Sequence, residues 1–95
     1  MKIIWSPQAR DDLLGIYRYI AADNPKAARA LHDRVVSRVL SLLETPQIGR
    51  PGRVAGTREL VIAGTSYIVP YRVRGEVLQI LRIYHTAQQW PESFD

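Results

Sequence analysis

Three side chains suited to proton transfer or phosphate binding lie close together near the end of the chain. Arg82, Tyr84 and His85 fall within the stretch "ILRIYHTAQQW", at the end of an apolar run. Cleavage of RNA by its own 2′-hydroxyl needs a base, an acid and cations that stabilise the crowded phosphate charge. These residue types could meet those needs without a metal ion. The stretch is therefore either a candidate active site or a strand that happens to carry polar side chains.

The composition narrows the class of protein. The chain has 95 residues, which predicts a single domain spanning residues 1–95. It has no cysteine, which excludes disulfides and thiolate chemistry. The first residues lack the apolar core of a signal peptide, and no apolar run approaches the roughly 18 residues that a membrane span needs. We therefore expect a soluble protein of the cytoplasm with no membrane contact.

The net charge of +4 is unevenly distributed. Residues 49–85 hold six arginines against only Glu59 and Glu76, whereas both lysines lie in the first third of the chain. Arginine makes flat, bidentate contacts with carboxylates and phosphates. The pattern leaves three interpretations open, namely a solvated basic surface, a nucleic-acid face and a docking site for an acidic protein.

Capping residues predict two helices after a short strand at residues 2–5. Ser6 followed by Pro7 is typical of a helix start, and so is Asn24 followed by Pro25. Apolar residues recur at helical spacing after each start. Because very few residues separate the two helices, we expect them to form an antiparallel hairpin.

A loop rich in glycine and proline, residues 45–57, leads into three runs with the valine, isoleucine and tyrosine content typical of strands. The runs cover residues 58–63, 66–74 and 76–85. Pro70 lacks a backbone donor, which predicts a bulge in the middle run. Together the elements predict an α+β fold, in which the helix hairpin packs on one face of a three- to four-stranded antiparallel sheet.

Alternation along the last two strands assigns their side chains to opposite faces of the sheet. The apolar set is expected to face the helices. Arginines around exposed aliphatic residues are typical of a protein-docking surface. We expect the open face to carry Arg72, Arg74, Arg82 and Tyr84, with Ile68, Leu78 and Ile80 among them.

Five local sequences follow one another in a specific order along nearly the whole chain. They are "ARDDLLGIYRYI" at 9–20, "NPKAA" at 24–28, "GRPGR…GTREL" at 49–60, "YIVPYRV" at 67–73 and "ILRIYH" at 80–85. In this order and at this length, they resemble the RelE/ParE superfamily of bacterial toxins from type II toxin–antitoxin modules. The glycine–arginine loop and the histidine that ends the last strand are most similar to the ParE branch.

The resemblance implies a toxin that an antitoxin silences, but the two branches imply different targets. ParE-like members are associated with plasmid stabilisation and with poisoning DNA gyrase, whereas RelE-like members cut messenger RNA in the ribosome. We expect a ParE-like toxin that binds DNA gyrase and is neutralised by an acidic antitoxin encoded next to it. A RelE-like, ribosome-dependent endoribonuclease is the alternative. A plain nucleic-acid-binding domain is disfavoured, because the chain has no recognition-helix pattern.

The residues that the resemblance implies for RelE-type cleavage are largely missing. Glu59 and Val61 stand where basic residues are implied on the first strand after the loop. Ile68 stands in place of an arginine on the next strand, and Ala87 in place of another past the last strand. The usual cationic set for RNA cleavage is therefore absent.

Some nuclease members use a glutamate and a histidine instead, which makes Glu59, Arg82 and His85 an alternative catalytic set. The sequence nevertheless favours a protein that is not an enzyme, and it predicts no cofactor. It predicts no metal site, because the carboxylates are spread over the helices. His85 alone is more typical of a packed or rim histidine, and Trp90 of a packing anchor. The expected antitoxin- or target-binding side chains are Arg50, Arg53, Arg58, Arg72, Arg74, Arg82 and Tyr84.

Overall fold

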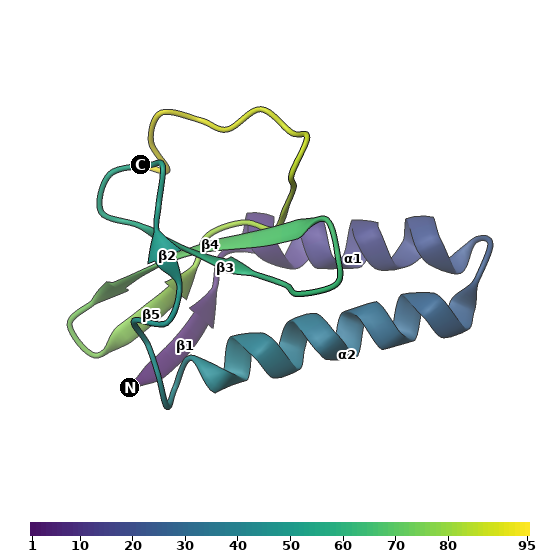
Figure 1. Cartoon of the computed structure of the whole chain (residues 1–95), viewed down its shortest axis with the longest axis horizontal. Helices are drawn as coiled ribbons and strands as arrows, with labels where there is room; N and C mark the ends of the chain where they lie inside the picture. Colours follow the sequence, from purple (N-terminus) through teal and green to yellow (C-terminus); the bar gives the residue numbers. More distant parts are fainter.

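A mixed sheet of six strands carries both helices on one of its faces (Figure 1). The computed structural model describes residues 1–95. In chain order the elements are β1 (Lys2–Trp5), α1 (Pro7–Ala21), α2 (Pro25–Ser41), β2 (Arg50–Pro51), β3 (Arg58–Val61), β4 (Tyr67–Arg74), β5 (Val77–Ile80) and β6 (Tyr84–His85). The strands lie in the order β1-β5-β4-β3-β2, and β6 pairs with β4 beyond the end of β5.

Both helices begin at the predicted caps. Ser6 Oγ accepts a hydrogen bond from the N–H of Ala9 at 3.0 Å, and Asn24 Oδ1 accepts one from the N–H of Ala27 at 3.1 Å. A proline follows each cap at the first helical position, where its missing N–H costs nothing. The helices run antiparallel, as predicted, and pack along each other (Figure 1).

The α+β fold with a helix hairpin on one face is confirmed, but the sheet is mixed and not wholly antiparallel. Strands β3, β4 and β5 are antiparallel, whereas β1 runs parallel to β5 with Lys2 opposite Val77. A parallel pair needs a long connection, and the helix hairpin with the strands that follow it provides one. The two-residue β2 forms the other edge, where Arg50 lies opposite Glu59.

The core lies between the helices and the covered face of the sheet. The prediction that Leu78 and Ile80 lie on the open face is wrong, because both are fully buried in this core. Leu78 pairs with Val73 and Ile80 with Tyr71 on β4, which fixes their orientation. Apolar residues stand on both faces of this run, so that alternation alone could not decide which face is covered.

The prediction of a bulge in the middle run is wrong, because β4 is continuous through Pro70 and the bulge lies on the opposite strand. Strand β4 pairs with β5 as far as Ile80 and with β6 from Tyr84, and the two registers differ by one residue. Residues 81–83 therefore form a bulge. The carbonyl of Pro70 accepts from the N–H of Leu81 at 3.0 Å, so its donorless nitrogen also faces this side. The bulge therefore lies opposite Pro70, which has no N–H to donate to the opposing strand.

The hydroxyl of Tyr71 ties the sheet to the loop that follows α2. It accepts from the N–H of Gly49 at 2.9 Å and donates to the carbonyl of Pro46 at 2.8 Å, while the residue is fully buried. Tyr71→Phe should lower the free energy of unfolding by about 1–3 kcal/mol, because two backbone groups lose their partner. Urea denaturation measures the change. Tyr19→Phe is the matched control, since Tyr19 is 82% exposed. Equal losses in both variants would contradict this role for the hydroxyl.

Candidate functional site

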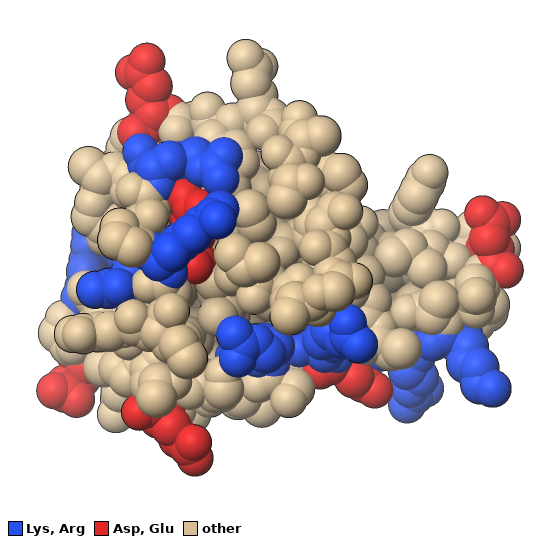
Figure 2. All heavy atoms as spheres, in the orientation of Figure 1, with Lys and Arg blue, Asp and Glu red and all other residues tan.

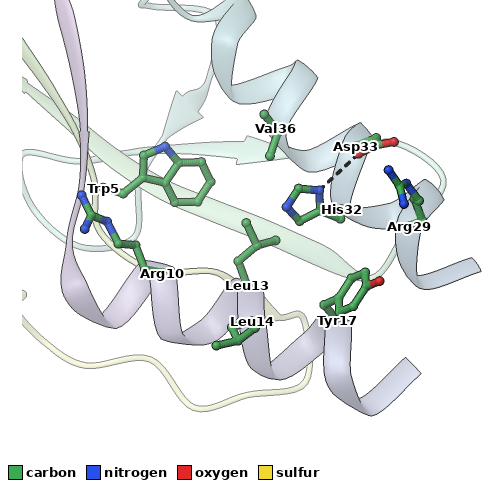
Figure 3. Close-up of a pocket in the computed structure, with 9 residues that line it drawn as sticks. All are labelled: Trp5, Arg10, Leu13, Leu14, Tyr17, Arg29, His32, Asp33 and Val36. Atoms are coloured by element: carbon green, nitrogen blue, oxygen red, sulfur yellow. Dashed lines mark hydrogen bonds and ion pairs between the residues drawn. The ribbon is translucent and has the colours of Figure 1, made fainter. Parts of the chain in front are cut away.

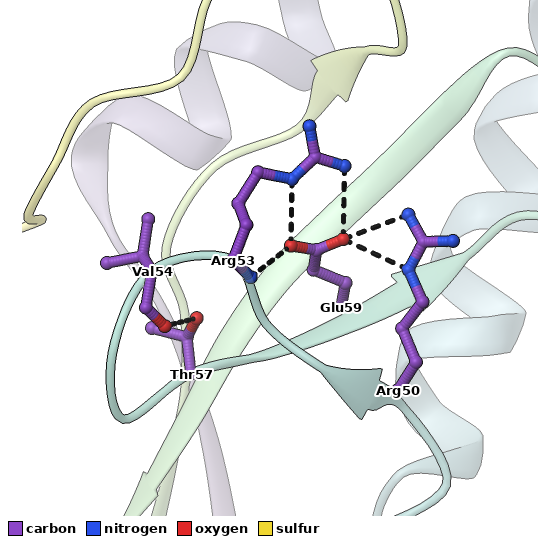
Figure 4. A network of polar contacts seen from close by, with 5 residues as sticks. All are labelled: Arg50, Arg53, Val54, Thr57 and Glu59. Atoms are coloured by element: carbon purple, nitrogen blue, oxygen red, sulfur yellow. Dashed lines mark hydrogen bonds and ion pairs between the residues drawn. The ribbon is translucent and has the colours of Figure 1, made fainter.

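A buried carboxylate at the β2–β3 edge of the sheet binds two arginines (Figure 4). Glu59 is only 2% exposed. Its Oε1 accepts from Arg50 Nε at 3.1 Å and Nη2 at 2.9 Å. Its Oε2 accepts from the backbone N–H of Arg53 at 2.8 Å and from Arg53 Nε at 3.1 Å. On this side of the molecule, basic side chains enclose an acidic one (Figure 2).

The electrostatics of this network keep Glu59 ionised. Burial alone would raise the pKa of Glu59, but the side-chain and backbone hydrogen bonds from Arg53, with those from Arg50, outweigh burial and lower it. A general base needs a free oxygen and a pKa near the working pH. Glu59 has neither. The side chains of Arg50 and Arg53 remain 51% and 44% exposed, so part of each guanidinium still faces solvent.

The loop between β2 and β3 is shaped by its own hydrogen bonds. The hydroxyl of Thr57 donates to the carbonyl of Val54 at 2.6 Å (Figure 4). The N–H of Gly52 donates to the carbonyl of Thr57 at 2.8 Å. The guanidinium of Arg58 donates to two carbonyls of the preceding loop, one of them that of Gly49 at 2.9 Å. One predicted binding residue, Arg58, therefore helps to hold the loop.

Arg82 binds the first helix and does not join the arginines of the sheet face. Its Nε and Nη2 donate to the two carboxylate oxygens of Asp12 at 2.7 and 3.0 Å. This hydrogen bonding raises the pKa of Arg82. The prediction that Arg82 stands beside Arg72 and Arg74 is wrong, because Arg82 belongs to the bulge and is held on α1. Asp12, on the first helix, is its partner.

The end of the chain, residues 86–95, which we call the C-terminal tail, crosses the sheet face away from the helices (yellow in Figure 1). Tyr84 is buried beneath it, contrary to the expectation of an exposed tyrosine, and burial raises its pKa. The ring centroid of Tyr84 lies 4.8 Å from that of Trp90 and 6.4 Å from that of Phe94. The guanidinium carbon of Arg53 lies 3.8 Å from the centroid of the Trp90 ring.

The tail also binds the two arginines at the far end of β4. Arg72 and Arg74 project away from the helices, as predicted. Arg72 Nη2 lies 2.9 Å from Asp95 Oδ1, and Arg74 Nη2 lies 3.6 Å from the same oxygen. Arg72 Nε also donates to Gln79 Oε1 at 2.8 Å. The face predicted to be open therefore carries its arginines, but the tail covers much of it.

The alternative catalytic set is not brought together. His85 lies opposite Tyr67 on β4, with the rings edge to face at 5.6 Å, whereas Glu59 lies opposite Pro70. Tyr67 and Pro70 are three positions apart on one strand and project to opposite faces. Glu59 and His85 are therefore on different sides of the sheet, and Arg82 is bound to α1.

The other positions of the RelE-type set carry no charge in this chain. Val61 is partly exposed, and Ile68 is buried. The N–H of Ala87 donates to Nδ1 of His85 at 3.1 Å, so this ring nitrogen acts as an acceptor. His85 is exposed at the rim of the sheet, in keeping with the expectation of a rim histidine.

No group of three or more His, Asp or Glu side chains is arranged to hold a metal ion. Neither helix is long and apolar enough to cross a membrane.

A groove between α1 and α2, which the sequence analysis did not identify, has a volume of about 630 Å³ (Figure 3). Its apolar lining includes Trp5 from β1, Leu13 from α1 and Val36 from α2, all of which point into it (Figure 3). Arg10 and Arg29 contribute basic groups from the two helices. The groove lies on the helix side of the molecule and the tail on the other side.

The sequence did contain a signal for this groove. Leu14 is 46% exposed on α1 and lines the groove, and the apolar residue Val36 of α2 lines it from the other helix. Apolar residues on a second helix face indicate a surface that is completed by a partner.

Comparison with known proteins identifies the family. The profile described as "ParE toxin of type II toxin-antitoxin system, parDE" matches residues 3–90. A protein of Sinorhizobium fredii named as toxin Y4kP is 44% identical over 91 residues, covering 96% of this chain and 94% of that protein. Toxin RelE2 of Caulobacter vibrioides is 34% identical over 87 residues, covering 92% and 97%.

A solved structure described as "Chromosomal ParDE TA system from P. aeruginosa" has the same fold. It superposes with a TM-score of 0.83 at 32% identity, over 90% of this chain and 95% of that one. The α+β fold is thus that of a small toxin of a toxin–antitoxin system. The chain belongs to the ParE family of type II toxins, within the RelE/ParE superfamily.

The lowered pKa of Glu59 makes a prediction about acid stability. A carboxylate whose pKa is lower in the folded state stabilises the fold above its unfolded pKa of about 4.5, and this contribution is lost as the pH falls through the folded value. Glu59→Gln should lower the free energy of unfolding at pH 7 by about 1–3 kcal/mol and flatten its decline below pH 4.5. Urea denaturation between pH 7 and pH 3 tests this. Glu92→Gln, at an exposed site, is the control, and identical pH profiles for the two variants would refute the prediction.

Proposed function

We propose that this toxin acts by binding its cellular target, DNA gyrase, in the cytoplasm, and that it does not cut RNA. The observation that supports this most directly is the placement of Glu59 and His85 on opposite faces of the sheet. Acid–base cleavage needs both groups within reach of one phosphate. A binding toxin needs aromatic and arginine side chains on one surface, since such residues dominate the energy of protein interfaces.

The arginines of the sheet face are the proposed contacts with target or antitoxin. Arg50, Arg53 and Arg74 have side chains about half exposed, so that a partner can reach them in the folded toxin. Arg72 and Tyr84 are covered by the tail and contribute only where it moves aside. Arg58 and Arg82 support the surface from within, through the loop carbonyls and Asp12.

The proposed partner is an acidic antitoxin encoded beside the toxin, in a module that stabilises a plasmid and arrests growth when the antitoxin is lost. The groove between α1 and α2 suits an amphipathic helix of such a partner, because its floor is apolar. Arg10 and Arg29 would face the carboxylates of that helix.

A RelE-like, ribosome-dependent endoribonuclease is the second candidate. The similarity to a protein named toxin RelE2 favours it. Under this alternative the ribosome replaces gyrase as the target, and His85 takes part in the chemistry.

Binding and catalysis predict opposite results for His85→Ala. Expressed without antitoxin, this variant should still arrest growth and inhibit supercoiling by purified gyrase, because the exposed ring lies away from the arginine face. Arg74→Ala should weaken gyrase inhibition roughly five- to hundred-fold, a loss typical of an interface arginine. Primer extension on translating ribosomes should give no discrete cuts with the unchanged toxin. Cuts in the ribosomal A site that disappear with folded His85→Ala would establish the nuclease alternative.

The groove makes a separate prediction about the antitoxin. Leu14→Arg places a charge in the apolar groove and should weaken antitoxin binding at least tenfold, since about 1.4 kcal/mol corresponds to each factor of ten. Tyr19→Arg is the matched control, because this exposed α1 residue is not part of the groove lining. Isothermal titration with the neighbouring gene product measures both affinities. Equal binding by the two variants would remove the groove from the antitoxin site.

A further inference from the structure

The C-terminal tail begins with a backbone hydrogen bond, from the N–H of Thr86 to the carbonyl of Ser66 at 2.8 Å, and from Gln89 onward it is held on the sheet by side chains. Beyond Gln88 its backbone makes no hydrogen bond to another backbone group. Trp90 lies between Tyr84 and the guanidinium of Arg53, and Phe94 stacks on the same tyrosine at 6.4 Å. A segment held in this way can detach without breaking the sheet, because none of the ladder hydrogen bonds involves it.

The charges of the tail complement those of the face it covers. Asp95 lies within ion-pair distance of both Arg72 and Arg74, at 2.9 and 3.6 Å. The tail thus presents two aromatic rings and then a carboxylate to a surface made of an aromatic ring and arginines. This pattern is the recognition chemistry of an aromatic–acidic peptide on an arginine surface.

The fit of the tail is incomplete. An open pocket of about 280 Å³ lies beside the tail, and its lining includes Tyr84 and Arg82 together with Phe94 and Asp95 of the tail. The indole Nε1 of Trp90 is buried without a hydrogen-bond acceptor. A buried donor without a partner is unfavourable, and the open pocket leaves room for further side chains beside the tail. A second segment with better complementarity could therefore displace the tail.

We propose that this sheet face is a peptide-binding site, occupied in cis by the tail and in trans by an aromatic–acidic segment of a partner protein. The bound partner places aromatic side chains on Tyr84 and Arg53 and a carboxylate on Arg72 and Arg74. Because the tail is tethered, it competes at a high effective concentration, of the order of millimolar for short tethers. A partner segment binds only if its affinity for the sheet face is high enough to displace the tail. The tail therefore makes the site selective for such segments. This inference goes beyond the proposed function, since it requires neither gyrase as the target nor the groove as the antitoxin site.

The test uses the full chain and a fluorescein-labelled peptide with the sequence of residues 88–95, "QQWPESFD". Fluorescence anisotropy should show at least tenfold tighter binding to the double variant Trp90→Ala/Phe94→Ala than to the unchanged protein, because the tail no longer competes. Adding Arg72→Ala to the double variant should reduce the affinity at least tenfold. Arg18→Ala, which removes an exposed arginine of α1, is the matched control and should leave the affinity unchanged.

Asp95→Lys keeps the test decisive if the double variant does not fold. This change repels the tail from Arg72 and Arg74 while both aromatic side chains remain, so the peptide should bind several-fold more tightly than to the unchanged protein. In a Trp5→Phe background, the emission of Trp90 should also shift to longer wavelength. The proposal is overturned if no folded tail variant binds more tightly than the unchanged chain. It is equally overturned if a scrambled peptide binds as well, or if Arg72→Ala has no effect.

Discussion

Pro70 has no backbone N–H to give to the strand beside it, and the structure around the sheet centre accommodates this absence. The opposing strand bulges at residues 81–83, and α1 satisfies the backbone groups that the bulge leaves unpaired. The hydroxyl of Ser6 donates to the first carbonyl of the bulge at 2.7 Å, and Asp12 accepts from its last N–H at 2.9 Å. These two hydrogen bonds join the start of α1 to the bulge. The bulge also determines where the conspicuous polar residues point, since Arg82 is held on α1 with its guanidinium carbon 4.9 Å from the ring centroid of Tyr84, while His85 lies on the other face of the sheet.

Several arginines of this chain form ion pairs within the molecule, so that only part of the arginine charge is available to a partner. Glu59, Asp12 and Asp95 each bind arginine side chains, so much of the apparent positive surface is balanced within the molecule. Arg53 has two contacts, because its guanidinium binds Glu59 and covers the ring of Trp90. The loop between β2 and β3 and the tail are therefore physically coupled through one side chain. Sequence charge alone overstates how much of the arginine content is free for a partner.

Local signals in the sequence were sufficient to predict the helices and strands. They were not sufficient to predict the contacts between residues far apart in the chain. Ser6 and Asn24 are caps whose partners lie three residues away, so the helix starts could be predicted. The orientation of Leu78 and Ile80 depends on register with β4, which a strand apolar on both faces does not encode. The pairing of Arg82 with Asp12 joins residues 70 positions apart. The tail has no periodicity that would indicate its place over Tyr84.

The two candidate surfaces differ in what a partner must do to use them. The groove between α1 and α2 is open, so a partner helix can enter it with little rearrangement. The sheet face is covered, so under the proposal made above a partner would have to displace the tail and would bind in proportion to the fraction of molecules in which the tail has detached. A protein that carries both an amphipathic helix for the groove and an aromatic–acidic segment for the sheet face would bind the groove first. Its second segment would then compete with the tail from a tethered position, where its effective concentration is high. Simultaneous attachment at both sites would offset the advantage that the tail gains from its tether, and a single short segment could not do so. The geometry therefore favours an extended partner that reaches around the molecule over a small one that binds a single face.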